Sequence, residues 1–150
     1  MAKNGIENDL EFQDCLKRGK IKEFSRGQAL VSKELAAAES DLNIAKSTLK
    51  VKGYKWATIQ SYYSMFHSAR ALLYSKDFRE KSHYCLIRAL KALFSSTGQV
   101  PLKLVEKMQK AKMLREAADY YDDWSPENAK ELIDSADELL NICKNILVKK

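Results

Sequence analysis

Hydrophobic positions recur at helical spacing along most of the chain. Between Gln28 and Lys50 they follow one another in steps of four and three, the seam of a helix in a near-antiparallel bundle, and they comprise Val31, Leu35, Ala38, Leu42, Ala45 and Leu49. The Lys52-Gly53 pair ends this helix. A second helix is predicted from about Tyr54 to Ser75, and the short connection makes the two helices antiparallel neighbours.

The same pattern continues through the second half of the chain. A polar link over residues 78–83 leads into a helix from Ser82, its expected N-cap, through Phe94. A further helix has Pro101 in its first turn and runs to about Tyr121. The Ser125-Pro126 pair then caps a last long helix, which ends in Lys149-Lys150.

The first residues are less regular than the rest. Residues 1–24 read as a weakly patterned lead-in with one short helix across Leu10 to Leu16. Only five Gly and two Pro interrupt the whole chain, and its long runs lack the alternation of β-strands. The sequence therefore predicts an all-α fold, an antiparallel up-and-down bundle of four to five long helices over residues 25–150, preceded by the lead-in.

The helix predicted over residues 54–75 carries two stripes of side chains. One stripe is ordinary core and contains Ile59, Tyr62, Phe66, Ala69 and Leu73. The other lies about a quarter turn away and combines aromatic surface with polar and cationic tips, in Trp56, Tyr63, His67, Arg70 and Tyr74. Two interpretations stay open: a helix buried on two sides with its polar tips satisfied, or a groove or self-association surface.

Composition and charge narrow the class of protein. The chain has 150 residues, 45% of them hydrophobic and 31% charged, which fits one globular domain. Its net charge of +6 admits a nucleic acid, a nucleotide or an acidic protein as partner, although the lysines are spread thinly. No apolar run is long enough to cross a bilayer. The odd number of cysteines, Cys15, Cys85 and Cys143, predicts reduced thiols in a cytoplasmic protein.

One charged residue falls where periodicity places the core. Arg115 lies on the apolar stripe of the helix that ends near Tyr121, and a buried cation needs a partner. Asp119, one turn later, can supply it, and Tyr120 follows. The group is either an internal ion pair that fixes helix register or a functional site.

Few other residues suggest chemistry. The chain lacks a glycine-rich phosphate loop, paired cysteines at metal spacing, and common hydrolase motifs, so no cofactor or metal is expected. His67 and His83 are candidates for moving protons, and each has a plain structural alternative as a satisfied or solvent-facing histidine.

Three blocks of the sequence together resemble the HEPN domain family of prokaryotes. They are Tyr62-Tyr63-x-x-Phe66-His67-x-Ala69-Arg70-Ala71-Leu72-Leu73, then Lys81-Ser82-His83, then Arg115-x-x-Ala118-Asp119-Tyr120, and the likeness spans about Gln28 to Leu147. The resemblance implies a bundle of four or five helices, frequent homodimers, and frequent pairing with a minimal nucleotidyltransferase in toxin-antitoxin-like modules.

Active members of that family resemble metal-independent ribonucleases that use an Arg followed, after four to six residues, by a His. Here Arg115 matches the Arg, but Asp119 and its neighbours replace the His. We therefore expect a dimerising module that binds a partner protein, a nucleotide or RNA without robust catalysis. The binding or interface candidates are Trp56, Tyr63, His67, Arg70, Tyr74, Arg115, Asp119 and Tyr120. The alternative is a ribonuclease toxin in which folding brings His67 or His83 beside Arg115.

Overall fold

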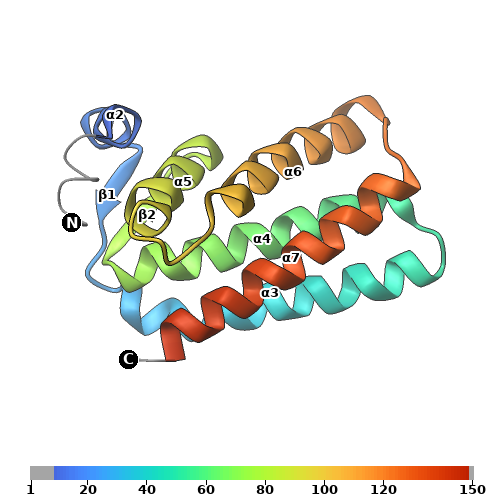
Figure 1. Cartoon of the computed structure of the whole chain (residues 1–150), viewed down its shortest axis with the longest axis horizontal. Helices are drawn as coiled ribbons and strands as arrows, with labels where there is room; N and C mark the ends of the chain where they lie inside the picture. The colour runs from blue at the N-terminus through green and yellow to red at the C-terminus, as the bar shows by residue number, and fades with distance from the viewer. Residues whose placement is uncertain (1–8, 149–150) are drawn as a thin grey trace.

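The helix with two stripes has the expected bounds, as α4 (Tyr54–Ser75), in the computed structural model, which describes residues 9–148. Its core stripe is confirmed, because all five residues assigned to it are at most 7% exposed. Helix α4 contacts α3 (Gly27–Lys50), α6 (Leu102–Tyr121) and α7 (Pro126–Val148), and Figure 1 shows it running among them. The prediction of an all-α helical bundle is confirmed.

The turn between α3 and α4 is as short as the sequence suggests. Lys52 has a positive φ of 64°, so the left-handed residue of this turn is the lysine, while Gly53 has φ −82°. A Cβ on Gly53 would lie 2.8 Å from Thr48 Cγ2, which explains the glycine by close packing. The two helices then pack along their length, as expected.

The segment after α4 differs from the predicted polar link. Phe78–Glu80 forms strand β2, which pairs antiparallel with β1 (Ile21–Glu23), with Ile21 opposite Glu80. Strands of three residues are too short to show alternation, so periodicity could not reveal them. The consequence for the site is direct, because β2 leads into the helix that begins at His83.

That helix begins as predicted and ends differently. Ser82 caps α5 (His83–Leu90) by accepting a hydrogen bond from the Cys85 N–H at 3.0 Å. A π-helical turn, η1 (Lys91–Ser95), follows where a continuous helix was expected. Pro101 is the N-cap of α6, one position before the first turn, and the cap of α7 is confirmed by Asn128 N donating to Ser125 Oγ at 3.1 Å.

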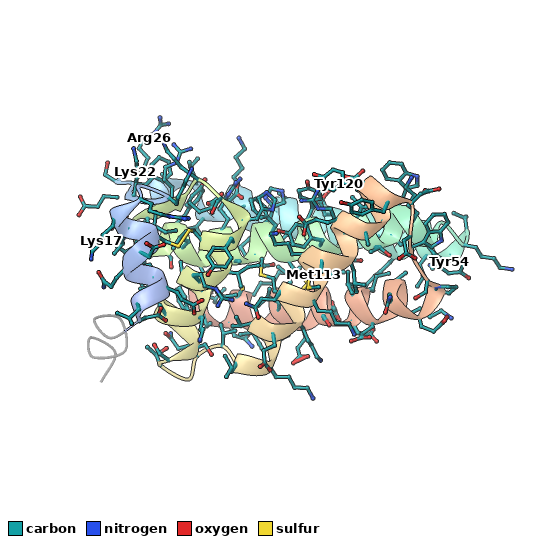
Figure 2. All side chains as sticks on the ribbon, turned by 90° about the horizontal axis from the view of Figure 1, so that it is seen from above. Lys17, Lys22, Arg26, Tyr54, Met113 and Tyr120 are labelled. Carbon is teal, nitrogen blue, oxygen red and sulfur yellow. A yellow bond between two sulfur atoms is a disulfide. The ribbon has the colours of Figure 1, made fainter. Side chains whose placement is uncertain are left out.

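The cysteine prediction is wrong for two of the three thiols. Cys15 and Cys85 form a disulfide with their Cα atoms 5.8 Å apart, and Cys143 is free and buried. Cys15 belongs to α2 (Leu10–Lys17), the short helix predicted in the lead-in, which packs against α5 at one end of the molecule (Figure 1; the disulfide is the yellow bond in Figure 2). A separation of 70 residues carries no local signal of pairing. The terminal Lys149-Lys150 lies outside the described residues.

Candidate functional site

Arg115 lies inside a box of tyrosine rings on the inner side of α6. Its side chain is 8% exposed, and its Cζ lies 5.3 Å from the ring centre of Tyr62 and 5.5 Å from those of Tyr63 and Tyr120. Nη1 donates a hydrogen bond to Tyr120 Oη at 3.1 Å and lies 3.6 Å from Asp119 Oδ2. The cation predicted to point inward does so, and three aromatic rings surround it in addition to the single carboxylate.

Tyr62 connects this cation to a histidine. The ring of Tyr62 is fully buried, and its hydroxyl lies 2.6 Å from His83 Nδ1. Burial, opposed by the Arg115 charge, raises the pKa of Tyr62 far above its ordinary value, so the hydroxyl keeps its proton. The hydroxyl can donate a hydrogen bond to Nδ1, in which case Nε2 of His83 carries the ring proton and is a donor. It can instead accept a hydrogen bond from Nδ1–H, in which case Nε2 is an acceptor.

His83 is held as a neutral imidazole. Its ring stacks on Phe66 with centroids 4.5 Å apart and on Tyr62 at 5.7 Å. Burial lowers the pKa of His83, and the nearby Arg115 cation lowers it further, while Glu80 opposes the shift. We call Tyr62, Tyr63, His83, Arg115 and Tyr120 the Arg115 cluster. It joins one of the two candidate histidines to the candidate arginine, from α4, α5 and α6.

The other histidine lies in a different group on α4. His67 Nδ1 is 2.8 Å from Glu34 Oε1, and its Nε2 is 3.7 Å from Asp41 Oδ2, both on α3. Arg70 Nη2 donates to Glu80 Oε2 at 2.6 Å. We call Glu34, Asp41, His67, Arg70 and Glu80 the Arg70 cluster. Phe66 separates it from the Arg115 cluster, since its ring also lies 4.4 Å from Arg70 Cζ.

Two residues of the second stripe belong to neither cluster. Trp56 is 54% exposed, with Lys55 Nζ 5.3 Å from its ring centre. Tyr74 is only 8% exposed and packs against Phe24 with ring centroids 5.1 Å apart. The second stripe is thus not one continuous surface, because its two ends face different surroundings.

Two hollows lie along α6, and Tyr120 of the Arg115 cluster lines the first of them. One, of about 330 Å³, is lined by Met113, Glu116, Ala117, Tyr120 and Tyr121. The other, of about 370 Å³, shares Met113 with the first and is lined also by Tyr84, Ile87, Arg88, Gln109 and Lys112. Met113 and Tyr120 are labelled on α6 in Figure 2. The cluster therefore borders the first hollow, with its exposed rings of Tyr120 and Tyr121, and the second hollow beyond Met113 holds Lys112 and the buried Arg88.

Comparison with known proteins places the chain in a family. The model of the HEPN domain family matches residues 31–146, which is most of the chain. The chain belongs to the HEPN family. Two similar proteins of Methanocaldococcus jannaschii are "Putative toxin MJ0142", 29% identical over 122 residues, and "Putative toxin MJ0605", 32% identical over 111 residues. The matches cover 80% and 73% of this chain, respectively, and 83% of each relative.

The structure adds residues of this HEPN domain that sequence reasoning did not single out. Glu80 is 7% exposed and holds Arg70, but it stood in what read as a polar link. Glu34 joins His67 and lies 3.6 Å from Arg70 Nη1. Tyr62 was assigned to the core alone. No local signal marked the two glutamates, because their partners come from elements that are distant in sequence.

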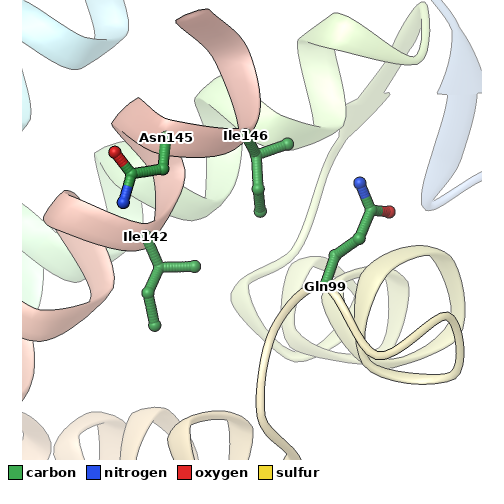
Figure 3. A pocket seen from close by; sticks show the side chains of 4 residues that line it. All are labelled: Gln99, Ile142, Asn145 and Ile146. Carbon is green, nitrogen blue, oxygen red and sulfur yellow. The ribbon is translucent and has the colours of Figure 1, made fainter. Parts of the chain in front are cut away.

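Other features of this HEPN domain carry less chemistry. Among residues 9–148, no group of three or more His, Cys, Asp or Glu side chains is placed to hold a metal ion. Over the same range, no helix has the length and apolar character needed to cross a membrane. A hollow of about 410 Å³ between α7 and the loop after η1 is lined by uncharged side chains, Gln99, Ile142, Asn145 and Ile146 (Figure 3).

Proposed function

We propose that this HEPN protein is the toxin component of a two-protein module and that it acts by cleaving RNA at the Arg115 cluster. The observation that carries the proposal is that His83 and Arg115 both contact Tyr62, the first at its hydroxyl and the second at its ring. Membership of the HEPN family and the names of the two relatives support a toxin role. The proposal is the ribonuclease alternative considered from the sequence, with His83 as the histidine that folding brings to Arg115.

The proposed chemistry needs a base and a cation. His83 Nε2 takes the proton of a ribose 2′-hydroxyl while Nδ1–H donates to Tyr62 Oη, and the 2′-oxygen attacks the adjacent phosphorus. The bond to the 5′-oxygen breaks and that oxygen takes a proton from a water molecule, leaving a 2′,3′-cyclic phosphate and a 5′-hydroxyl end, while the His83 imidazolium returns its proton to the solvent. Arg115 stabilises the extra negative charge that develops on the phosphoryl oxygens, as a preorganised cation does.

The surface beside the cluster suits single-stranded RNA. Tyr120 and Tyr121 are 65% and 79% exposed, and exposed rings stack on bases without regard to sequence. Lys112 lines the adjoining hollow and can contact a phosphate, whereas Arg88 in the same hollow is buried and bound by Glu11. The second component is proposed to be a minimal nucleotidyltransferase, and the toxin itself a homodimer, as the family resemblance implies.

The test combines growth with cleavage by the pure protein. Expression of the wild type should arrest growth, and the pure protein should cut single-stranded RNA in a chelator. His83→Ala should lower the rate by about 10²- to 10⁴-fold, the range for a lost general base. Tyr62→Phe should act in the same direction, more weakly.

Two further variants make this test specific. Lys144→Ala, on α7, removes only the surface ion pair with Glu39 and should leave the rate unchanged. His67→Ala separates the two candidate histidines, because its imidazole contacts Glu34 and not Tyr62. Cleavage that survives His83→Ala but is lost with His67→Ala would refute the assignment of the base.

A second candidate function is a module that binds RNA or its partner without cutting. It is favoured by the burial of Arg115, whose Nη1 is already engaged by Tyr120 and Asp119, and by the absence of a histidine after the arginine. In that case the pure protein binds RNA, yields no cyclic phosphate, and loses affinity when Tyr120→Ala removes a stacking ring. Binding without products at any pH between 5 and 9 would select this candidate.

A further inference from the structure

A disulfide ties the lead-in to the helix that carries His83. Cys15 comes from α2 and Cys85 from α5, two residues after His83. The family match begins at residue 31, so α2 and β1 precede the part that defines a HEPN domain. The covalent link therefore connects a segment outside the family match to the candidate site inside it.

Without this link, α2 has few attachments to the bundle. Only Phe12 and Cys15 are buried among its residues. Glu11 adds polar contacts to α5, accepting from Tyr84 Oη at 3.1 Å and from Arg88 Nη1 at 3.1 Å, but its carboxylate is about half exposed. Arg88 is only 8% exposed and Leu16 packs against the core, so the disulfide, Phe12, Leu16 and the Glu11–Arg88 pair together hold this short helix in place.

Three contacts transmit the position of the lead-in to the start of α5. Strand β1 pairs with β2 up to Glu80. Lys81 N then donates to Lys20 O at 2.8 Å, and the disulfide holds Cys85 to Cys15 of α2. His83 lies between these contacts. A change in the lead-in therefore acts on the residues that flank His83 on both sides.

We propose that the Cys15–Cys85 pair is a redox site that regulates the Arg115 cluster, and that its co-reactant is a dithiol reductant. The reductant supplies two electrons and two protons, becomes a disulfide itself, and leaves Cys15 and Cys85 as thiols. Both sulfurs are buried, so the attacking thiolate reaches them when α2 opens locally. Once reduced, α2 and β1 separate from α5, and the site around His83 becomes less ordered. The effect on RNA cleavage rests on the function proposed above.

The experiment compares oxidised and reduced full-length protein without any RNA. Thiols freed by dithiothreitol are trapped with a neutral alkylating reagent, and amide hydrogen exchange is followed by mass spectrometry. Exchange in residues 10–23 and 78–88 should rise by about tenfold or more, while α3 and α7 stay protected. Unchanged protection of the lead-in, or loss of protection throughout the bundle, would overturn a local redox switch.

A second readout follows the site itself. NMR titration of the two histidines should show the pKa of His83 rising toward its ordinary value on reduction, since burial is the main cause of its lowering. Arg115, Glu80, Lys112 and Arg70 also act on this imidazole. An unchanged titration of His83 in trapped, reduced protein contradicts the proposal. Neither readout uses RNA, so a failure of the ribonuclease proposal leaves this test intact.

Variants supply matched controls. Cys15→Ser should reproduce the exchange pattern of the reduced wild type, while Cys143→Ala should retain the pattern of the oxidised protein. Phe12→Ala, with the disulfide intact, should speed reduction by about tenfold because it eases the opening of α2. If Cys15→Ser fails to fold, reversible reduction and reoxidation of the wild type still decides. A reduction rate that is insensitive to Phe12→Ala would show that opening of α2 does not expose the sulfurs.

Discussion

The two clusters on either side of Phe66 place the same residue types in opposite electrostatic surroundings. In the Arg70 cluster, Arg70 and His67 face carboxylates at 2.6 Å and 2.8 Å. In the Arg115 cluster, the cation faces three tyrosine rings, and its carboxylate partner stands 3.6 Å away at the rim. Carboxylates neutralise the cations of the Arg70 cluster, whereas in the Arg115 cluster aromatic faces surround the guanidinium without neutralising its charge. The Arg115 cluster is therefore the one whose positive charge can still attract an anionic ligand.

The largest expected effect comes from breaking the Arg70 cluster. In Arg70→Met, the side chain of Glu80, which is 6% exposed, loses its cation and remains buried. Breaking a buried pair from one side costs about 3 to 5 kcal/mol, so the free energy of unfolding in denaturant should fall by about that amount. The double variant with Glu80→Gln should recover much of the loss. Full stability of Arg70→Met would show that this pair does not hold β2.

A smaller loss is expected for Arg115→Met. Asp119 is 39% exposed and stays hydrated when the cation is removed, so no buried charge is stranded. What is lost are the contacts with the tyrosine faces, worth about 1 to 3 kcal/mol in total. The same denaturation measurement tests this. A loss equal to that of Arg70→Met would remove the distinction between the clusters and make Arg115 a structural ion pair.

The smallest effect is a dependence of stability on pH. Because the folded-state pKa of His83 is lowered, the unfolded chain binds the proton more readily. The contribution of His83 is fully present above its ordinary pKa of about 6.5 and is lost as pH falls from there through the folded-state value. Melting temperatures between pH 8 and 5 should show this fall. It should be absent in His83→Gln and retained in His67→Gln.

The helices and the inward position of Arg115 could both be predicted from the sequence, for physical reasons. A long helix repeats its burial every three or four residues, so α4 and the core side of α6 leave a periodic record. That record also exposed Arg115 as a charge on an apolar stripe. Asp119 was found because it belongs to the same helix, one turn away.

What the sequence could not supply depends on contacts between distant segments. His83 meets Arg115 through Tyr62, and these residues come from three helices. The β1–β2 pairing and the disulfide likewise join the lead-in to residues near position 80. The division into a lead-in of residues 1–24 and a bundle of residues 25–150 stays a prediction. Homodimerisation and the nucleotidyltransferase partner likewise stay proposals.

Cys143, the remaining cysteine, is the one thiol in the described part of the chain that could exchange with the disulfide of the oxidised protein. Its sulfur is buried against Ser68 O, at 3.5 Å, and burial raises the pKa of this thiol far above its ordinary value. Only a thiolate attacks a disulfide, so burial disfavours exchange of Cys143 with the other pair while the protein is folded. The folded protein should therefore keep the Cys15–Cys85 pairing on storage.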